Sequence, residues 1–419
     1  MKGWITIVAS LLATILLWMG AKIVAPANSF SQGASQILGL MGLMSLAWTY
    51  ILATRHSLIE QMFDGLDKAY KYHHILGGLS LVLLLNHVLL LIVGSMPANT
   101  LSLYLVPGTS LPYTLGILAL YVMIFLLSLT LYVRLPYRFW KWSHEWIGIV
   151  IILGGLHGML ISSDTSSYLS LRYWVMAWSL LATASFLYKR FGYYLHGVKK
   201  YRIVKSGKEQ GLLVLSLETS EKTIEFKPGQ YGFFSLPKTT GLVPREEHAF
   251  SILGSYENKL IIGVKIVGKF SEKMSTLLVG DEIRVKGPFG NFGEKMSESK
   301  HLIWIAGGIG ITPFLSMAKS VRTDQKVDMY FCARIMPPAV MTEPFHNLSQ
   351  QNPNFRWLPC ETSKGGRLTA RRVFAETESD KDAHYMLCGP KEMMESIAQD
   401  LSALGIKRSH IIYEDFAFK

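Results

Sequence analysis

Residues 73–87 read HHILGGLSLVLLLNH, and residues 144–157 read HEWIGIVIILGGLH. Each stretch is an apolar run of helical length with a histidine at both ends: His73 and His87 in the first, His144 and His157 in the second. Because a helix rises about 1.5 Å per residue, the histidines of each stretch lie about 20 Å apart along the axis. Two such helices side by side could hold two haems between opposed imidazoles, which indicates an electron path across a membrane.

The two histidine spacings differ by one residue, and this has a geometric consequence. Fourteen residues make about 3.9 helical turns, so the first pair shares one face. Thirteen residues make about 3.6 turns, which leaves His144 and His157 about 140° apart on a straight helix. We therefore predict either a distortion near Gly154-Gly155 or a kinked first turn that carries His144.

Two further histidines lie near the first stretch. His74 is also thirteen residues from His87 and is the rival inner ligand, although the helical angle favours His73. His56, beside Arg55, has no spaced partner, so we interpret it as an interfacial residue. For Arg55 we expect contact with either a haem propionate or a lipid phosphate.

Six segments are long and apolar enough to span a hydrocarbon core, which needs about 20 residues. We predict them at 4–24, 33–54, 72–95, 112–133, 145–162 and 171–190. Lys and Arg gather in the loops after the second, fourth and sixth segments, while the opposite loops hold little beyond Lys22 and Arg172. The positive-inside rule therefore places both termini in the cytoplasm of a multi-pass cell-membrane protein. Ala25-Pro26-Ala27 offers a signal-peptidase site as an alternative, but the long apolar run before it favours a retained helix.

The composition of the 419-residue chain is 50% hydrophobic with a net charge of +12, and the apolar excess ends near residue 190. Many basic residues flank the apolar segments, where they orient a membrane protein, so we predict no nucleic-acid partner. Cys332, Cys360 and Cys388 all lie in the soluble half. They form neither a disulfide framework nor a metal-binding spacing, which suits a reducing cytosol.

The soluble half changes pattern twice. From about Lys199 to Gly293, short strands and turn signals predict a small antiparallel barrel. From 302 to 404, strand, glycine turn and helix alternate, which predicts an α/β domain. The strand Leu302–Ala306 leads into Gly307-Gly308-Ile309-Gly310-Ile311-Thr312-Pro313, where Thr312 is expected to cap a helix that begins at Pro313. Glycines at such a turn let a dinucleotide pyrophosphate approach backbone N–H groups.

Taken in order, these features resemble a prokaryotic member of the NADPH oxidase family, within the ferric-reductase superfamily. The resemblance covers almost the whole chain and implies three domains. They are an all-α, six-helix transmembrane di-haem bundle at 1–198, an antiparallel β-barrel FAD domain at 199–298, and an α/β Rossmann-like NAD(P)H domain at 299–419. The histidine spacings match the family's haem ligands, which implies His73 and His144 for an inner haem b and His87 and His157 for an outer one.

The resemblance also implies a set of cofactor contacts. His248-Ala249-Phe250-Ser251 is similar to the family's His-Pro-Phe-Ser/Thr flavin motif, with alanine in place of proline, and Lys265 and Ser271 match the stretch that holds the FAD pyrophosphate. The FAD-binding residues implied are therefore His248, Phe250, Ser251, Lys265 and Ser271. The nicotinamide-binding residues implied are Gly307, Gly308, Gly310, Thr312, Cys388, Gly389 and Pro390.

Three further implications concern the coenzyme and the flavin ring. Arg334 and Arg367 match arginines that bind the 2′-phosphate of NADPH, for which a guanidinium is well suited. NADPH is therefore the expected coenzyme, with NADH as an alternative that the enzyme could also use. Phe416, chosen over Phe418, resembles the aromatic residue that covers the flavin ring, and together with Cys388 it is the expected catalytic residue.

The function that follows is transfer of electrons from cytosolic NADPH through FAD and two haems b to extracellular O2, which produces superoxide. Leu91 stands where animal oxidases have another histidine, so a ferric or metal-chelate reductase remains an alternative. A third possibility is that the chain is an electron-donor subunit that serves an extracytoplasmic protein docking on the loop 96–111. The chain has no recognisable calcium-binding loop or regulatory extension, so no obligatory protein activator is expected.

Overall fold

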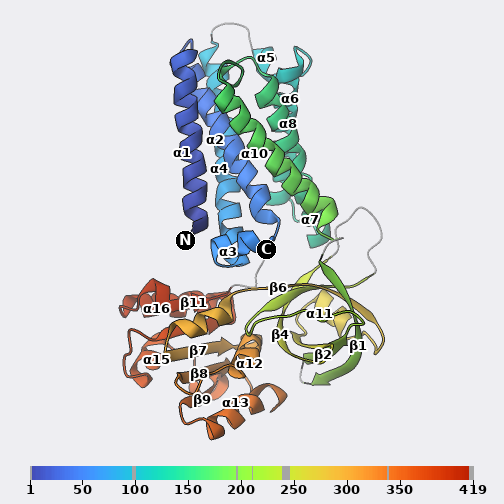
Figure 1. The fold of residues 1–419 in the computed structure, drawn as a ribbon, viewed down its shortest axis with the longest axis vertical. Coiled ribbons are helices and arrows are strands. Elements are labelled where there is room, and N and C mark those ends of the chain that lie inside the picture. Colours follow the sequence, from blue (N-terminus) through green and yellow to red (C-terminus); the bar gives the residue numbers. More distant parts are fainter. Residues whose placement is uncertain are drawn as a thin grey trace. The chain divides into compact units, whose positions relative to one another are not determined.

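The computed structural model describes residues 2–96, 101–194, 197–209, 211–237, 246–336 and 339–414. It divides between residues 196 and 197 into two compact units, each of which is described by itself (Figure 1). The first unit is helical, and the second contains all of the β-structure that the described residues form. The predicted fold class, a helical apolar region followed by a barrel and an α/β domain, is confirmed.

Six longer helices form the first unit at the positions predicted for the apolar segments. They are α1 (Lys2–Val24), α2 (Phe30–Ala53), α4 (Leu66–Gly94), α6 (Leu111–Leu131), α8 (Gly148–Leu160) and α10 (Leu169–Leu187). Short helices connect them: α3 (Ser57–Phe63), α5 (Leu101–Leu105), α7 (Tyr137–Glu145) and α9 (Asp164–Ser167). A π-helical turn, η1 (Tyr188–Gly192), follows α10.

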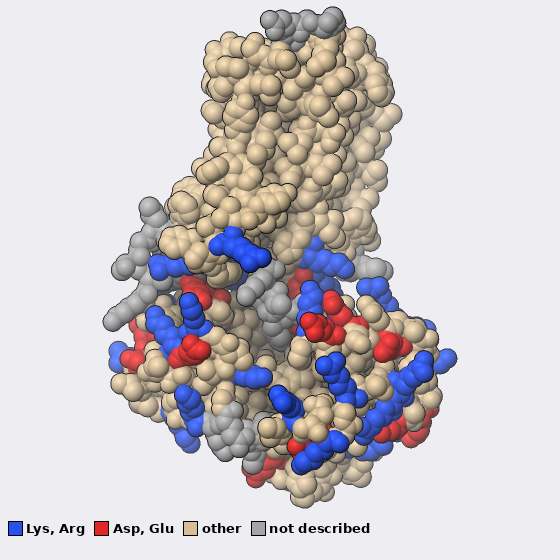
Figure 2. Space-filling model, turned by 180° about the vertical axis from the view of Figure 1, so that it is seen from behind, with Lys and Arg blue, Asp and Glu red and all other residues tan. Residues whose placement is uncertain are grey.

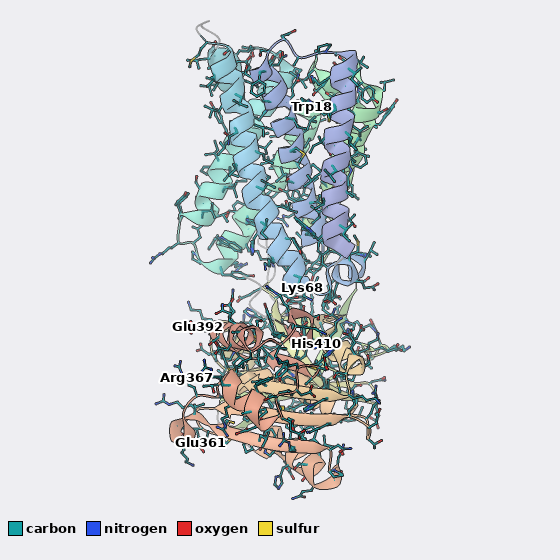
Figure 3. All side chains as sticks on the ribbon, turned by 90° about the vertical axis from the view of Figure 1, so that its left-hand side faces the viewer. Trp18, Lys68, Glu361, Arg367, Glu392 and His410 are labelled. Carbon is teal, nitrogen blue, oxygen red and sulfur yellow. The ribbon has the colours of Figure 1, made fainter. Side chains whose placement is uncertain are left out.

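Five spans in this unit are long and apolar enough to cross a membrane: α1, α2, α4, α6 and the stretch Tyr137–Leu160, which combines α7 and α8. The sixth predicted segment, α10, has the length but is less apolar, because it contains Arg172 and several hydroxyl side chains. On the face seen in Figure 2, the helical unit is almost free of Lys, Arg, Asp and Glu except at one end. Lys68 lies at that end and Trp18 near the other (Figure 3).

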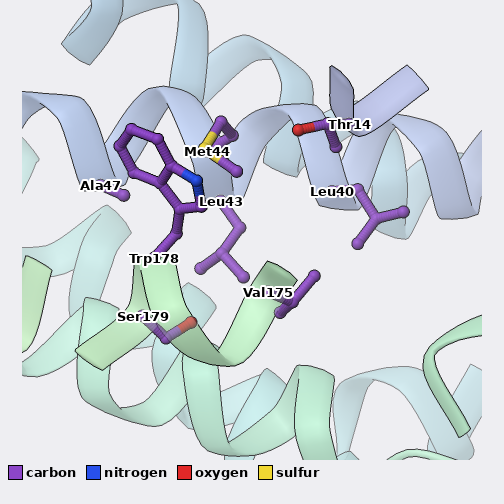
Figure 4. A pocket seen from close by; sticks show the side chains of 8 residues that line it. All are labelled: Thr14, Leu40, Leu43, Met44, Ala47, Val175, Trp178 and Ser179. Atoms are coloured by element: carbon purple, nitrogen blue, oxygen red, sulfur yellow. The ribbon is translucent and has the colours of Figure 1, made fainter. Parts of the chain in front are cut away.

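Helix α2 is central to the unit, packing against α1, α4, α8 and α10. A glycine in α2 lets the two helices α2 and α4 pack closely, since a Cβ on Gly42 would lie 2.7 Å from the Leu84 side chain. Small residues serve this purpose widely in membrane helices. Between α1, α2 and α10 lies a small cavity (Figure 4), lined by Thr14, Leu40, Leu43, Met44, Ala47, Val175, Trp178 and Ser179.

The second unit begins with a closed barrel of six antiparallel strands in the order β1-β2-β5-β4-β3-β6. The strands are β1 (Val198–Glu209), β2 (Leu212–Glu218), β3 (Tyr231–Ser235), β4 (His248–Tyr256), β5 (Lys259–Lys265) and β6 (Glu282–Phe289), with helix α11 (Lys269–Met274) after β5. Alternate residues of β2 face opposite sides. Leu213, Leu215 and Leu217 fill the barrel, whereas Leu212 and Val214 pack against the α/β domain.

The α/β domain is built on a parallel sheet in the order β11-β10-β7-β8-β9. Its strands are β7 (His301–Gly307), β8 (Lys326–Ala333), β9 (Phe355–Glu361), β10 (His384–Cys388) and β11 (Ile411–Tyr413). The main helices are α12 (Thr312–Ala318), α13 (Ala339–Gln351), α15 (Ala370–Glu376) and α16 (Lys391–Ala403). Both faces of β7 are buried, which explains its continuous apolar sequence.

The direction of strand progression reverses beside β7. The chain proceeds from β7 to β8 and β9 on one side, then returns to place β10 and β11 on the other. At such a switch point, the loops that follow the two adjacent strands diverge and leave a crevice at their carboxyl ends. The loops after β7 and β10 are therefore where a nucleotide is expected to bind.

Candidate functional site: paired histidines and a glycine-lined crevice

The four spaced histidines meet as two pairs inside the helical unit. The ring centroids of His73 and His144 lie 5.9 Å apart, and those of His87 and His157 lie 6.5 Å apart. A metal bound to one nitrogen of each ring, at about 2 Å per bond, would separate the two centroids by about 6 Å. The separation within each pair is therefore compatible with one metal ion held between its two imidazoles.

Hydrogen bonds fix which nitrogen of three rings is available to a metal. The Nδ1 atom of His73 lies 2.9 Å from Thr49 O, and that of His157 lies 2.8 Å from Pro112 O. His87 Nδ1 lies 2.8 Å from Ser35 O. A carbonyl can only accept, so each Nδ1 carries the proton and each Nε2 is left with a lone pair. Metal-binding histidines characteristically donate their other ring N–H in this way.

His144 is held differently. Its ring stacks on Trp140 with centroids 5.3 Å apart and planes 5° from parallel. Among the described residues its Nδ1 is buried without a hydrogen-bond partner. Trp140 in turn stacks on Tyr137, so three rings of α7 follow one another. An aromatic face, rather than a carbonyl, orients this imidazole.

The predicted irregularity in the second histidine helix is present. Helix α7 ends at Glu145 and α8 begins at Gly148, so His144 and His157 lie on separate helices. Backbone bonds from Trp146 N to Ser143 O and from Ile147 N to His144 O tighten this turn. The second of the two expected alternatives, a kinked first turn, is therefore the one observed, and the distortion does not fall at Gly154-Gly155.

Glycines make room for the outer pair. A Cβ on Gly39 of α2 would lie 2.9 Å from His87 Nδ1, and one on Gly116 of α6 would lie 2.9 Å from His157 Nδ1. Both distances are shorter than ordinary van der Waals contacts, so a larger residue would displace the ring. The sequence analysis did not single out these two glycines, because isolated glycines in apolar helices are common.

The structure also shows the surroundings of three basic residues near the histidine pairs in the sequence: His74, His56 and Arg55. His74 is exposed, while the ring of His73 faces His144. The side chain of His56 accepts a bond from Leu58 N and so caps α3. Arg55 donates from Nε to Tyr70 at 2.8 Å and reaches Tyr193 at 3.3 Å, contacts that the sequence did not predict.

In the second unit, the glycine turn after β7 and the Cys-Gly-Pro segment after β10 lie against each other. A Cβ on Gly310 would lie 2.2 Å from Cys388 O, and one on Gly389 would lie 3.0 Å from Gly307 Cα. Only glycine allows this approach of two backbones. These two loops follow the two strands on either side of the switch point, the position at which nucleotides bind in sheets of this kind.

The helix that follows the turn begins one residue earlier than predicted. Thr312 is the first residue of α12 and does not cap it, because the 3-10 turn Gly308–Ile311 runs directly into the helix. The Thr312 hydroxyl donates to Ile309 O at 2.9 Å and is 3.0 Å from Ser251 Oγ. Thr312 thereby links the glycine turn Gly307–Ile311 to the barrel.

A second bond joins α12 to the barrel, from Gly229 N to Ser316 Oγ at 2.8 Å. Gly229 has a φ of +82°, and a Cβ there would lie 2.8 Å from Gly293 N. The turn at Pro228-Gly229, the backbone at Gly293 and α12 therefore meet at one place. Glu414, buried directly after β11, also approaches this junction, since a Cβ on Gly290 would lie 2.7 Å from its carboxylate. No motif in the sequence pointed to Glu414.

The residues expected to contact flavin lie on β4, at the end of β5 and on α11. His248 stacks on Phe270 with ring centroids 4.0 Å apart, and the ring of Phe250 lies nearly parallel to that of Phe270 with centroids 6.3 Å apart. Ser271 caps α11: its hydroxyl accepts from Val267 N and Gly268 N and donates to Gly268 O. A Cβ on Gly308 would lie 3.9 Å from Lys265 Nζ, which brings Lys265 to the glycine turn.

The two candidate phosphate-binding arginines are exposed. Arg334 directly follows β8, and Arg367 follows the short helix α14 (Thr362–Gly365) after β9. Both therefore lie beyond the carboxyl edge of the sheet, and Arg367 projects from the surface (Figure 3). Phe416, the residue expected over the flavin, lies outside the described residues, as does Phe418.

Comparison with known protein families finds three matches along the chain. Residues 38–155 match the family described as ferric reductase like transmembrane component. Residues 201–293 match the oxidoreductase FAD-binding domain, and 304–399 match the oxidoreductase NAD-binding domain. The chain is thus a membrane oxidoreductase in which a ferric-reductase-like transmembrane component is fused to FAD- and NAD-binding domains.

Among curated proteins, the chain is similar to the F subunit of the Na(+)-translocating NADH-quinone reductase. The protein of Pseudomonas paraeruginosa is 29% identical over 165 residues, which cover 36% of this chain and 40% of that protein. The corresponding protein of Haemophilus ducreyi is 28% identical over the same shares of both chains. The match thus spans about two fifths of the length of these relatives.

Among solved structures, a ferredoxin NADP+ reductase from Neisseria gonorrhoeae, with bound FAD and NADP, aligns at 19% identity and a TM-score of 0.44. The alignment covers 50% of this chain and 92% of that one. A flavohemoglobin from Malassezia yamatoensis aligns at 18% identity and a TM-score of 0.48, covering 77% of this chain and 92% of that one. Scores below 0.5 support no functional argument.

Proposed function

We propose that this chain is a transmembrane NADPH oxidase, which carries electrons from cytosolic NADPH through FAD and two bis-histidine haems b to O2 on the opposite side. Superoxide is the product. FAD and haem b supply the steps that pass electrons one at a time, which amino-acid side chains alone do not provide. The protein contributes binding, orientation and distance.

The observation that carries the proposal is the pair of opposed imidazoles at two levels of the helical unit. Separations of 5.9 and 6.5 Å between ring centroids leave room for a metal ion between the two imidazoles of each pair. Three of the four rings also donate Nδ1–H to a backbone carbonyl, which leaves Nε2 for a metal. The His73–His144 pair and the His87–His157 pair would each hold one haem, which would supply one-electron transfer.

In this proposal, the residues of the second unit have the roles that the sequence predicted for them. His248, Phe250, Ser251, Lys265 and Ser271 would hold FAD; Gly307, Gly308, Gly310, Thr312, Gly389 and Pro390 would hold the nicotinamide coenzyme. Cys388 and Phe416 would act beside the reacting rings. Arg334 and Arg367 would bind the 2′-phosphate, which favours NADPH over NADH.

The proposed domains are 1–198, 199–298 and 299–419, with both termini and the two soluble domains in the cytoplasm. The support for this orientation is the distribution of Lys and Arg between alternate loops of the helical unit. It puts the His73–His144 pair on the NADPH side and the His87–His157 pair nearer the other face.

The test is NADPH oxidation by purified, FAD-supplemented protein in detergent, with superoxide-dismutase-sensitive cytochrome c reduction measured in the same assay. The proposal predicts dismutase-sensitive reduction in proportion to NADPH consumed. Haems that NADPH reduces without oxygen, but that yield little superoxide in air, would contradict O2 as the acceptor. Ferric chelates would then be assayed, as the ferric-reductase-like component suggests.

A further inference from the structure

The two cysteines that the proposed electron path does not use are direct neighbours. Cys332 near the end of β8 and Cys360 near the end of β9 are register partners in the parallel sheet. Both are free thiols, 8% exposed, and both belong to the same cluster of buried residues on one face of the sheet. Their side chains therefore project from adjacent strands to the same side.

This spacing suits a disulfide. Neighbouring strands lie about 4.8 Å apart, and disulfide-linked residues have Cα atoms about 4.4–6.8 Å apart. Cys388 does not compete, because β7 separates β10 from β8 and because Cys388 packs in the cluster on the opposite face. Among the three cysteines, only Cys332 and Cys360 are placed to pair.

We propose that Cys332 and Cys360 are a redox modification site, which peroxide converts to an intramolecular disulfide and cellular thiols restore. The reaction is balanced by hydrogen peroxide as the oxidant. The Cys360 thiolate attacks one peroxide oxygen and breaks the O–O bond, which forms a sulfenic acid and releases the other oxygen as hydroxide. The proton that Cys360 lost on ionising neutralises this hydroxide to water. The Cys332 sulfur then attacks the sulfenic sulfur, the S–O bond breaks, and the transferred oxygen leaves with the Cys332 thiol proton as a second water.

The surroundings give the two thiols different roles. A hydrogen bond from the Cys332 thiol lowers the pKa of Cys360 against the opposing effect of burial, and the nearby charge of Arg372 acts in the same direction as the hydrogen bond. The same hydrogen bond, together with burial, raises the pKa of Cys332. As a thiol, Cys360 donates to Leu358 O at 3.6 Å. Cys360 is therefore the residue that reacts first, and Cys332 the one that resolves the intermediate.

The disulfide would bridge the carboxyl edge of the sheet. One residue beyond Cys332 and two beyond Cys360, the two strands are already joined, since the Thr362 hydroxyl donates to Ala333 O at 3.3 Å. Arg334 follows immediately. If the proposed function is right, closing this bridge should change the KM for NADPH while leaving haem content unchanged. The formation of the disulfide itself does not depend on the proposed function.

The experiment treats the full chain with hydrogen peroxide in detergent, blocks remaining thiols by alkylation, and maps the digested peptides by mass spectrometry. We expect peptides containing Cys332 and Cys360 to be joined, and the free thiols to fall from three to one. Reduction by dithiothreitol should restore all three. Oxidation of Cys388 alone, or a Cys332–Cys360 bond that appears only in urea, would overturn the proposal.

Variants test the assigned order of reaction. Cys332→Ser should leave Cys360 as a sulfenic acid that dimedone labels, whereas Cys360→Ser should leave Cys332 as an unmodified thiol. Equal labelling in the two variants would contradict the assigned roles. Arg372→Gln should slow oxidation several-fold at pH 7, and Arg371→Gln, its exposed neighbour on α15, is the matched control. Unchanged haem and FAD content shows that each variant is folded.

Discussion

The carbonyl oxygens of Thr49, Ser35 and Pro112 decide the chemistry of the helical unit at the scale of single residues. Each accepts the Nδ1 proton of one histidine, so the tautomer of that ring is fixed before any metal binds. These acceptors are backbone atoms, so no pattern of side chains in the sequence could predict them. The spacing of the histidines could be predicted, but their hydrogen-bond partners could not.

The distinction between His73 and His74 gives a direct test. His73→Ala should reduce bound haem from about two to about one per chain, because an iron that loses one axial imidazole is held far more weakly. His74→Ala is the matched control and should keep both haems, since this side chain is exposed. The measurement is haem per chain by the pyridine haemochrome assay. Haem loss in His74→Ala with retention in His73→Ala would reverse the assignment.

A second prediction concerns His301, which lies at the opposite edge of the sheet from the crevice. Burial alone would lower its pKa, but hydrogen bonds to Asp328 at 2.9 Å and Asp380 at 2.7 Å raise it above the usual value. The imidazolium therefore stabilises the folded state below pH about 6.5, and this stability is lost as pH rises through the raised pKa. The contribution is on the order of 1–3 kcal/mol for charge-assisted bonds.

Thermal unfolding of the full chain with and without His301→Gln measures this effect. The variant should be destabilised most at pH 6 and progressively less as pH rises beyond the folded-state pKa. The unsubstituted chain, measured at the same pH values, is the comparison. A difference for His301→Gln that grows with pH would show that the sign is wrong.

At the scale of elements, the break between α7 and α8 resolves the odd spacing of the second histidine pair. On a straight helix His144 and His157 would face about 140° apart, and the break between α7 and α8 removes this constraint. The sequence could not locate the break, because Trp146 and Ile147 are compatible with an apolar helix. The tertiary requirement that His144 face His73 decides the position.

Trp140 carries a prediction for α7. Trp140→Ala should shift the midpoint potential of one haem by tens of millivolts, because an aromatic contact contributes about 0.5–1.5 kcal/mol and about 59 mV corresponds to a tenfold change in a one-electron equilibrium. Trp140→Phe retains an aromatic face and should remain near wild type. A redox titration followed by haem absorbance distinguishes them. Equal shifts of both haems would contradict a local effect on His144.

The glycine turn after β7 makes a prediction for the crevice. Gly310→Ala would place a Cβ 2.2 Å from Cys388 O, and relieving this backbone clash costs about 1–3 kcal/mol. We expect the KM for NADPH to rise about tenfold or more, with both haems still bound. Gly365→Ala, which meets no heavy atom within 4 Å, is the control and should behave as wild type. Normal kinetics for Gly310→Ala would exclude this turn from coenzyme binding.

At the scale of the whole molecule, the sequence predicted the order of the parts because each part has its own periodicity. Long apolar runs, short alternating strands and repeated strand–turn–helix units indicate different architectures. The junction between barrel and sheet was less predictable. Tertiary packing of α12 brings together four residues there: Ser251, Thr312, Ser316 and Gly229. The sequence also predicted the start of α12 one residue too late.

We propose that electrons cross the membrane by way of the two histidine pairs. The decisive measurement uses sealed vesicles whose second unit faces outward, with cytochrome c trapped inside and NADPH added outside. We expect the trapped cytochrome c to be reduced, enclosed superoxide dismutase to suppress the signal, and His87→Ala to abolish it. NADPH oxidation with superoxide only on the outside would contradict transmembrane transfer.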